Sequence, residues 1–113
     1  MAQATPTRID LHLRIKVKAG RREEFFAFLR EATPFYESPG GIAIRLLEDA
    51  SDDHRFIELV LYDDEVAYRR DQDRVEHDPT MKRYLARWRE LLAEKPVVEV
   101  YRLCAPRRTG GTA

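Results

Sequence analysis

The stretch RIDLHLRIKVK, residues 8–18, alternates between apolar and polar side chains along its length. One set of alternate positions is aliphatic, and the other carries charged groups together with His12. Successive side chains of a strand point to opposite faces, so this period of two predicts a half-buried β-strand. Gly20 then ends the pattern.

The hydrophobic period changes after Gly20. In residues 21–37 the apolar side chains recur three and four positions apart, which predicts an amphipathic helix. The sequence Ser-Pro-Gly-Gly at 38–41 predicts a turn. Residues 42–48 and 55–62 are both strand-like, and the polar segment between them predicts a β-hairpin.

The second half of the chain repeats a helix-then-strand order. Asp63 or Asp64 can cap a helix, because a short acidic side chain accepts hydrogen bonds from free backbone N–H groups. Asp78-Pro79 predicts a second helix start, since proline suits the first helical position. Residues 97–103, VVEVYRL, predict a last strand.

The element order is therefore β-α-β-β-α-β, with the second helix in two pieces. This order predicts a ferredoxin-like α+β fold, a four-stranded antiparallel sheet with helices on one face. We expect one such domain over residues 8–103, a flexible N-terminus at 1–7 and a flexible C-terminal tail at 104–113.

Composition excludes several classes of function. The 113 residues fit one domain, and 20 basic residues balance 20 acidic ones. This balance argues against nucleic-acid binding and against a polybasic membrane anchor. No apolar run is long enough to span a membrane, and the N-terminus lacks the apolar core of a secretory signal. The single cysteine, Cys104, fits a reduced, cytoplasmic protein without a disulfide.

The strand pattern also predicts what each face of the sheet carries. The side chains expected beneath the helices are aliphatic: Leu11, Leu13, Ile15, Ile42, Ile44, Leu46, Ile57, Leu59 and Leu61. The opposite face is expected to mix apolar and charged groups: His12, Arg14, Ala43, Arg45, Leu47, Phe56, Glu58, Val60, Tyr62, Glu99 and Tyr101.

A mixed patch of this size is typical of an association surface. We therefore predict a homodimer that packs sheet on sheet, with Arg14, Arg45, Phe56, Glu58, Val60 and Tyr101 in the interface. Its arginines could pair with Glu58 or Glu99. The alternative is a monomer whose long arginine stems cover the aromatic side chains.

Asp71 is the first candidate for a chemical role. On the predicted helix, Ala67, Asp71 and Val75 share one inward face at four-residue steps. A carboxylate in that place could act as a base towards a phenolic or activated C–H proton. The alternatives are an ion pair with Arg70, Arg74 or an arginine of another element, or a partly exposed helix edge.

His12 is the second candidate, because an imidazole can act as a general base near neutral pH. The alternative is a structural histidine that is satisfied by Glu58 or by a tyrosine across the sheet. His54 and His77 lie in polar segments without the spacing of metal ligands, so no metal site is predicted.

Aromatic side chains could line a pocket for a flat organic ligand, since tyrosine offers an apolar ring and an orienting hydroxyl. The expected pocket residues are Phe25, Tyr62, Tyr68, Asp71 and Trp88. The alternative is that these aromatic residues only fill the core or an interface.

Three stretches carry a family resemblance: RIKVKAGRREEFFAFLREA (14–32), RFIELVLYDDEVAYRRD (55–71) and YLARWRELLAEKPVVEVYRL (84–103). Together they resemble the dimeric α+β barrel superfamily, and within it the antibiotic biosynthesis monooxygenase-like domain, with the NIPSNAP-type domain as a near relative. The resemblance implies a homodimer whose two sheets close a barrel. It also implies cofactor-free oxygenation of aromatic polyketides in active members, and haem binding in others.

One position departs from the family pattern. The helix after the third strand often begins Glu-x-Ala, with a histidine four residues after the alanine. Here Glu65-Val66-Ala67 matches, and Asp71 stands at the histidine position. Haem iron usually takes a neutral imidazole from a protein, which a carboxylate does not replace.

These patterns lead to three hypotheses. The first is a cofactor-free, monooxygenase-like protein or a binder of small aromatic molecules. The second is a non-catalytic homodimeric interaction domain, and the third is a haem-binding or haem-degrading relative. We expect no cofactor and no metal, and neither nucleic acid nor membrane as a partner.

Overall fold

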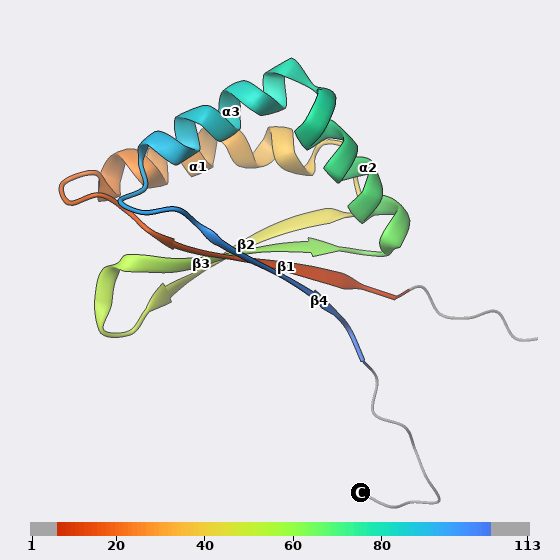
Figure 1. The fold of residues 1–113 in the computed structure, drawn as a ribbon, viewed down its shortest axis with the longest axis horizontal. Coiled ribbons are helices and arrows are strands. Elements are labelled where there is room, and N and C mark those ends of the chain that lie inside the picture. The colour runs from red at the N-terminus through yellow and green to blue at the C-terminus, as the bar shows by residue number, and fades with distance from the viewer. Residues whose placement is uncertain (1–6, 105–113) are drawn as a thin grey trace, which may run out of the picture.

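The computed structural model describes residues 7–104, which form a single sheet with helices along one face (Figure 1). The elements in chain order are β1 (Ile9–Lys16), α1 (Arg22–Glu37), β2 (Ile42–Asp49), β3 (Asp52–Tyr62), α2 (Glu65–His77), α3 (Pro79–Glu90) and β4 (Val97–Arg102). The strands are antiparallel in the order β2-β3-β1-β4. The predicted ferredoxin-like α+β fold is confirmed. The flexible ends predicted at 1–7 and 104–113 fall almost wholly outside the described residues.

Aspartates begin both helices of the second half, as predicted. The Asp64 side chain accepts a hydrogen bond of 2.8 Å from the backbone N–H of Ala67. The Asp78 side chain accepts from the backbone N–H groups of Thr80 and Met81. These caps satisfy N–H groups that have no partner inside a helix, and they separate α2 from α3.

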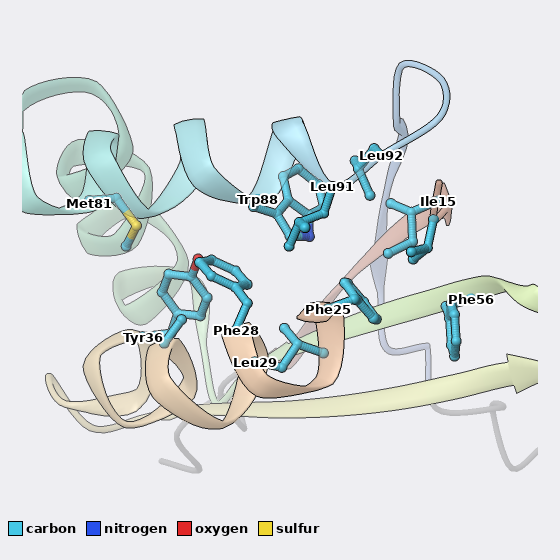
Figure 2. Packing of buried hydrophobic residues seen from close by; sticks show 12 residues of the cluster. Ile15, Phe25, Phe28, Leu29, Tyr36, Phe56, Met81, Trp88, Leu91 and Leu92 are labelled. Atoms are coloured by element: carbon cyan, nitrogen blue, oxygen red, sulfur yellow. The ribbon is translucent and has the colours of Figure 1, made fainter. Parts of the chain in front are cut away.

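The main core lies between the sheet and helices α1 and α3. Figure 2 shows Trp88 and Met81 of α3 directed towards the side chains that α1 presents, Phe28 and Tyr36 among them. A smaller buried cluster lies beneath the start of α2: Ile9, Ile42, Val60, Tyr62 and Ala67. There the start of α2 lies close to the turn between α1 and β2. A Cβ added at Gly41 in that turn would lie only 3.3 Å from the Ala67 Cβ.

The predicted orientation of β3 is wrong by one residue. Phe56, Glu58, Val60 and Tyr62 were expected on the helix-free face, and all four are buried on the helix-covered face. In the ladder Phe56 pairs with Ile15 and Val60 pairs with Leu11, so these residues share the face of the β1 aliphatic side chains. The helix-free face instead carries Ile57, Leu59 and Leu61.

The remaining positions predicted for the helix-free face are confirmed. Glu99 and Tyr101 pair with His12 and Asp10 of β1, so they lie on the helix-free side with Arg14 and Arg45. The Arg14 Nε lies 2.7 Å from Glu99 Oε1 within this chain. The arginine stems do not cover the whole face, because Leu47, Val97 and Tyr101 remain exposed.

Strand β4 is the least covered element of the sheet. Val98 and Val100 pair with Leu13 and Leu11, which places them on the helix-covered side. Even so, Val98 is 57% exposed and Val100 is 51% exposed. Among the helices of residues 7–104, none is both long and apolar enough to cross a membrane.

Candidate functional site

A cavity of about 210 Å³ lies between the sheet and the three helices. Its walls are mainly aliphatic, from residues of β1, β2 and β3 and from the inward faces of α2 and α3. A small number of polar groups reach it: Tyr36, Glu58, Tyr62, Asp71, Gln72, Trp88 and Arg89. An apolar hollow with a few polar groups is the usual form of a small-molecule site.

Asp71 and Tyr62 form one polar pair of the cavity. The Tyr62 hydroxyl donates a hydrogen bond of 2.6 Å to Asp71 Oδ2. Asp71 is 8% exposed. Its Oδ1 lies 3.4 Å from Arg74 Nε, within ion-pair distance, but this oxygen accepts no hydrogen bond. Burial, followed by the nearby Asp71 carboxylate, raises the pKa of the Tyr62 hydroxyl above its ordinary value, so Tyr62 acts as a donor at neutral pH.

Glu58 and Trp88 form the second polar pair. Glu58 is 3% exposed, and its Oε1 accepts a hydrogen bond of 2.8 Å from Trp88 Nε1. Burial raises the pKa of the Glu58 carboxyl to about 7, and the hydrogen bond from Trp88 opposes part of that rise. Such a carboxyl exists in both protonation states near neutral pH, which is a property of acid–base groups in enzymes.

Tyr36 of α1 adds a second hydroxyl to the cavity wall, after that of Tyr62. Burial is the main reason that the pKa of Tyr36 lies above its ordinary value, and the Glu58 carboxylate is the next. Tyr36 therefore stays neutral when Glu58 ionises, and it can serve as a hydrogen-bond donor at physiological pH.

Three of the five predicted pocket residues line the cavity: Tyr62, Asp71 and Trp88. Phe25 does not line it, because its ring is packed in the core against Phe56 at a centroid distance of 5.2 Å. Tyr68 packs edge-on against the Tyr62 ring, outside the cavity lining. Phe25 and Tyr68, which were predicted to line the same pocket as the other three residues, therefore lie outside it.

His12 lies on the helix-free face, on the other side of the sheet from the cavity. Its ring is 4.7 Å from the Tyr101 ring, and its buried Nδ1 has no hydrogen-bond partner. His12 therefore takes no part in the cavity. The predicted alternative, a histidine satisfied by Glu58 or by a tyrosine, does not describe this position either, because Glu58 lies on the other face and Tyr101 contacts His12 only through its ring.

A metal ion and haem are two further ligands that the described residues can be compared with. Asp52, Asp53 and His54 lie together in the β2–β3 hairpin, where the Asp53 carboxylate already contacts the His54 ring at 2.7 Å. No histidine is among the described residues that line the cavity, so haem iron would find no imidazole ligand there. Asp71 at the position of the family's histidine gives iron no neutral nitrogen.

Two residues of the cavity wall, Glu58 and Val60, were wrongly assigned to the dimer interface, and Glu58 is the one with a chemical signal in the sequence. The signal was a lone glutamate in the apolar strand RFIELVLY, together with a single tryptophan that needs an acceptor when it is buried. Either observation could have directed attention to a buried Glu–Trp pair.

The strand order and the half-open cavity define a ferredoxin-like α+β domain with an apolar hollow beneath its helices. The chain belongs to the antibiotic biosynthesis monooxygenase family, whose sequence model matches residues 9–87. No curated protein matches the sequence.

Solved structures share the fold. One is a putative antibiotic biosynthesis monooxygenase from Caulobacter crescentus, 17% identical, with a TM-score of 0.72 over 89% of this chain and 93% of that one. Another is SnoaB, a cofactor-independent oxygenase from Streptomyces nogalater, 19% identical, with a TM-score of 0.67 over 88% of this chain and 94% of that one. A conserved protein from Methanosarcina mazei is 14% identical, with a TM-score of 0.72 over 86% and 93%.

Proposed function

We propose that the protein binds a small hydroxylated aromatic molecule in the cavity and oxygenates it with dioxygen, without a metal or an organic cofactor. The observation that carries this proposal is the cavity itself, an apolar hollow that contains two buried carboxyl groups, Glu58 and Asp71. Membership of the antibiotic biosynthesis monooxygenase family and the fold shared with a cofactor-independent oxygenase support the reaction class.

The cavity volume limits the size of the ligand. An apolar cavity of about 150 Å³ accommodates benzene, so a cavity of about 210 Å³ suits one ring or two fused rings. The aliphatic walls suit the faces of such rings, and Trp88 offers a flat surface beside them. The proposed ligand is therefore smaller than a four-ring polyketide.

The polar groups determine which substituents the ligand carries. An ionised carboxylate only accepts hydrogen bonds, so Asp71, and Glu58 in its ionised form, favour a ligand with hydroxyl groups. Asp71 Oδ1 lacks a hydrogen-bond partner, and Tyr62 holds the other oxygen of the same carboxylate. Asp71 and Tyr62 would thus hold one oxygen substituent of the ligand in a fixed direction.

The chemistry requires an electron-rich ring in a site with little water. Removing the hydroxyl proton makes the ring a better electron donor to dioxygen. For a naphthol the products are a naphthoquinone and water: one oxygen atom of dioxygen enters the ring, and the other leaves with two hydrogens of the substrate. The protein binds and orients the ring, excludes water and accepts the proton.

A homodimer is part of the proposal. The helix-free face carries Ile57, Leu59, Leu61, Leu47 and Tyr101, and a second copy would cover this face. Arg14, Arg45 and Tyr101 retain their proposed place in the interface. The alternative function is a non-catalytic dimeric domain. The exposed valines of β4, Val97, Val98 and Val100, favour this alternative because they offer apolar surface to a partner.

Ligand binding can be measured through the intrinsic fluorescence of the protein, because Trp88 is the single tryptophan of the chain and lines the cavity. We expect 2-naphthol to quench Trp88 emission in a saturable way, and oxygen uptake with formation of naphthoquinone to accompany binding. Binding without oxygen uptake would reduce the function to ligand binding. Absence of saturable quenching would contradict both.

A further inference from the structure

We propose that Glu58 is the group that accepts the proton of the ligand hydroxyl, while Asp71 and Tyr62 anchor the ligand at a second oxygen. This inference rests on the proposed function and assigns separate roles to the two carboxyl groups of the same cavity.

The two carboxyl groups differ in their partners. Asp71 accepts a hydrogen bond from Tyr62 and lies beside the Arg74 guanidinium, so its negative charge is already paired. Among the described residues Glu58 has one hydrogen-bond donor, Trp88, and no cation within ion-pair distance. A carboxylate without a cationic partner in an apolar site gains most from taking up a proton.

The position of Glu58 in the sheet explains its isolation. It stands in the middle of β3, and its neighbours on the same face are Leu13 of β1 and Leu46 of β2. Leucine side chains cannot hydrate or pair a charge, so the sheet supplies no stabilisation for the carboxylate. The sequence nevertheless places a glutamate there, together with a tryptophan that reaches it from α3.

The groups that face the cavity from each helix complete the setting. Tyr36 comes from α1, Asp71 from α2 and Arg89 from α3. Tyr36 stays protonated when Glu58 ionises, because burial and the Glu58 charge both raise the pKa of its hydroxyl. Titration of the cavity near neutral pH therefore involves the Glu58 carboxyl, which burial brings to a pKa of about 7.

The proposed step is a single proton transfer. The ligand O–H bond breaks, the proton moves to a carboxylate oxygen of Glu58, and the electron pair stays on the ligand oxygen. The total charge of the cavity is unchanged, and the negative charge moves from the carboxylate onto an aromatic ring that delocalises it. Trp88 holds Oε1 in place during the transfer.

Binding and proton transfer can be followed with 2-naphthol, whose hydroxyl becomes strongly acidic in its excited state. Naphtholate emission from the bound probe reports transfer of the hydroxyl proton to a nearby base. We expect the bound probe to show naphtholate emission above about pH 7, where Glu58 is a carboxylate, and to lose that emission below it. Naphthalene, which lacks the hydroxyl, reports binding alone.

Three variants separate the roles. Glu58→Gln keeps an oxygen acceptor for Trp88, so we expect the variant still to bind 2-naphthol. It should lose the naphtholate emission over the range of about pH 6 to 8, roughly one pH unit on either side of neutrality. Asp71→Asn should retain the emission, because Glu58 remains. Glu76→Gln, an exposed position on α2, should behave as the unmodified protein.

Naphtholate emission that survives in Glu58→Gln, or that disappears in Asp71→Asn alone, would overturn the assignment while leaving the binding function intact. If neither 2-naphthol nor naphthalene quenches Trp88, the proposed function fails. The division of roles then fails with it. Where binding is observed, a 13C carboxyl titration tests the acidity of Glu58 separately: a midpoint near 7 supports Glu58 as the proton acceptor, and an ordinary midpoint near 4.5 overturns that role.

Discussion

The Trp88 indole Nε1 donates a hydrogen bond of 2.8 Å to Glu58 Oε1, and this bond connects α3 to the centre of β3 through the interior. It pairs the single tryptophan of the chain with a carboxyl group that is 3% exposed. Both members line the cavity, so one interaction contributes to packing, to the acidity of Glu58 and to the shape of the site.

Stability should depend on pH through Glu58. Burial raises the pKa of the Glu58 carboxyl to about 7 in the folded protein, whereas its ordinary value, which applies to the unfolded chain, is 4.5. The native state therefore holds the proton more tightly than the unfolded state. The free energy of unfolding should therefore fall as pH rises from about 4.5 to 7, by about 3 kcal/mol.

Urea unfolding at several pH values measures this effect as the difference between the unmodified protein and Glu58→Gln. The variant cannot ionise at that position, so its stability should lack this component. Glu76→Gln is the matched exposed control. A stability difference that stays constant from pH 4.5 to 7 would contradict the buried ionisation.

Removing the indole donor should make Glu58 a weaker acid. In Trp88→Phe the Glu58 carboxylate loses the hydrogen bond that lowers its pKa, so the 13C titration midpoint should move above 7. The lost bond and the smaller ring should also lower the free energy of unfolding by about 1–3 kcal/mol. A midpoint that does not move would indicate that Trp88 does not control the acidity of Glu58.

Asp71→Asn should weaken the anchoring of a second ligand oxygen. We expect 2,6-dihydroxynaphthalene to bind the unmodified protein more tightly than 2-naphthol does, and the variant to lose most of that difference. A hydrogen bond to a charged group contributes about 1.5–3 kcal/mol, which corresponds to roughly 10- to 100-fold in Kd. Asp73→Asn, an exposed position on the same helix, is the control. Equal losses in both variants would exclude a specific anchor.

The helix-free face should mediate self-association. We expect light scattering to give twice the chain mass of 13.3 kDa, and Leu59→Arg to give a monomer because it places a charge in the centre of the apolar patch. Val66→Arg changes an exposed valine on α2, away from the sheet, and should leave the dimer intact. A monomeric unmodified protein would remove dimerisation from the proposed function.

The order of elements could be predicted from the sequence because each element has one clear period or cap. The strand at 8–18 alternates strictly, and Asp64 and Asp78 begin their helices through side-chain hydrogen bonds. Such signals are local, so they do not depend on how the strands pair.

The orientation of β3 could not be predicted in the same way. The segment RFIELVLY is apolar in both phases, with Ile57, Leu59 and Leu61 in one and Phe56, Val60 and Tyr62 in the other. Glu58 falls in the second phase, and its charge made the first phase look like the buried one. The ladder with β1 decides the orientation, and it buries Glu58 against Trp88.

Asp71 was identified from helical spacing, and its ion-pair partner Arg74 was among the alternatives. Its second partner, the Tyr62 hydroxyl, depended on the orientation of β3 and could not be read from the helix alone. For the same reason Phe25 and Tyr68 were grouped with a cavity that they do not line.

A crystal structure of the protein with 2-naphthol tests most directly whether the cavity is a ligand site with Glu58 as its proton acceptor. We expect the rings between the sheet and α3, beside Trp88, with the naphthol oxygen within hydrogen-bond distance of the Glu58 carboxyl. An empty cavity at saturating 2-naphthol, or a ligand bound elsewhere on the protein, would contradict the proposed site.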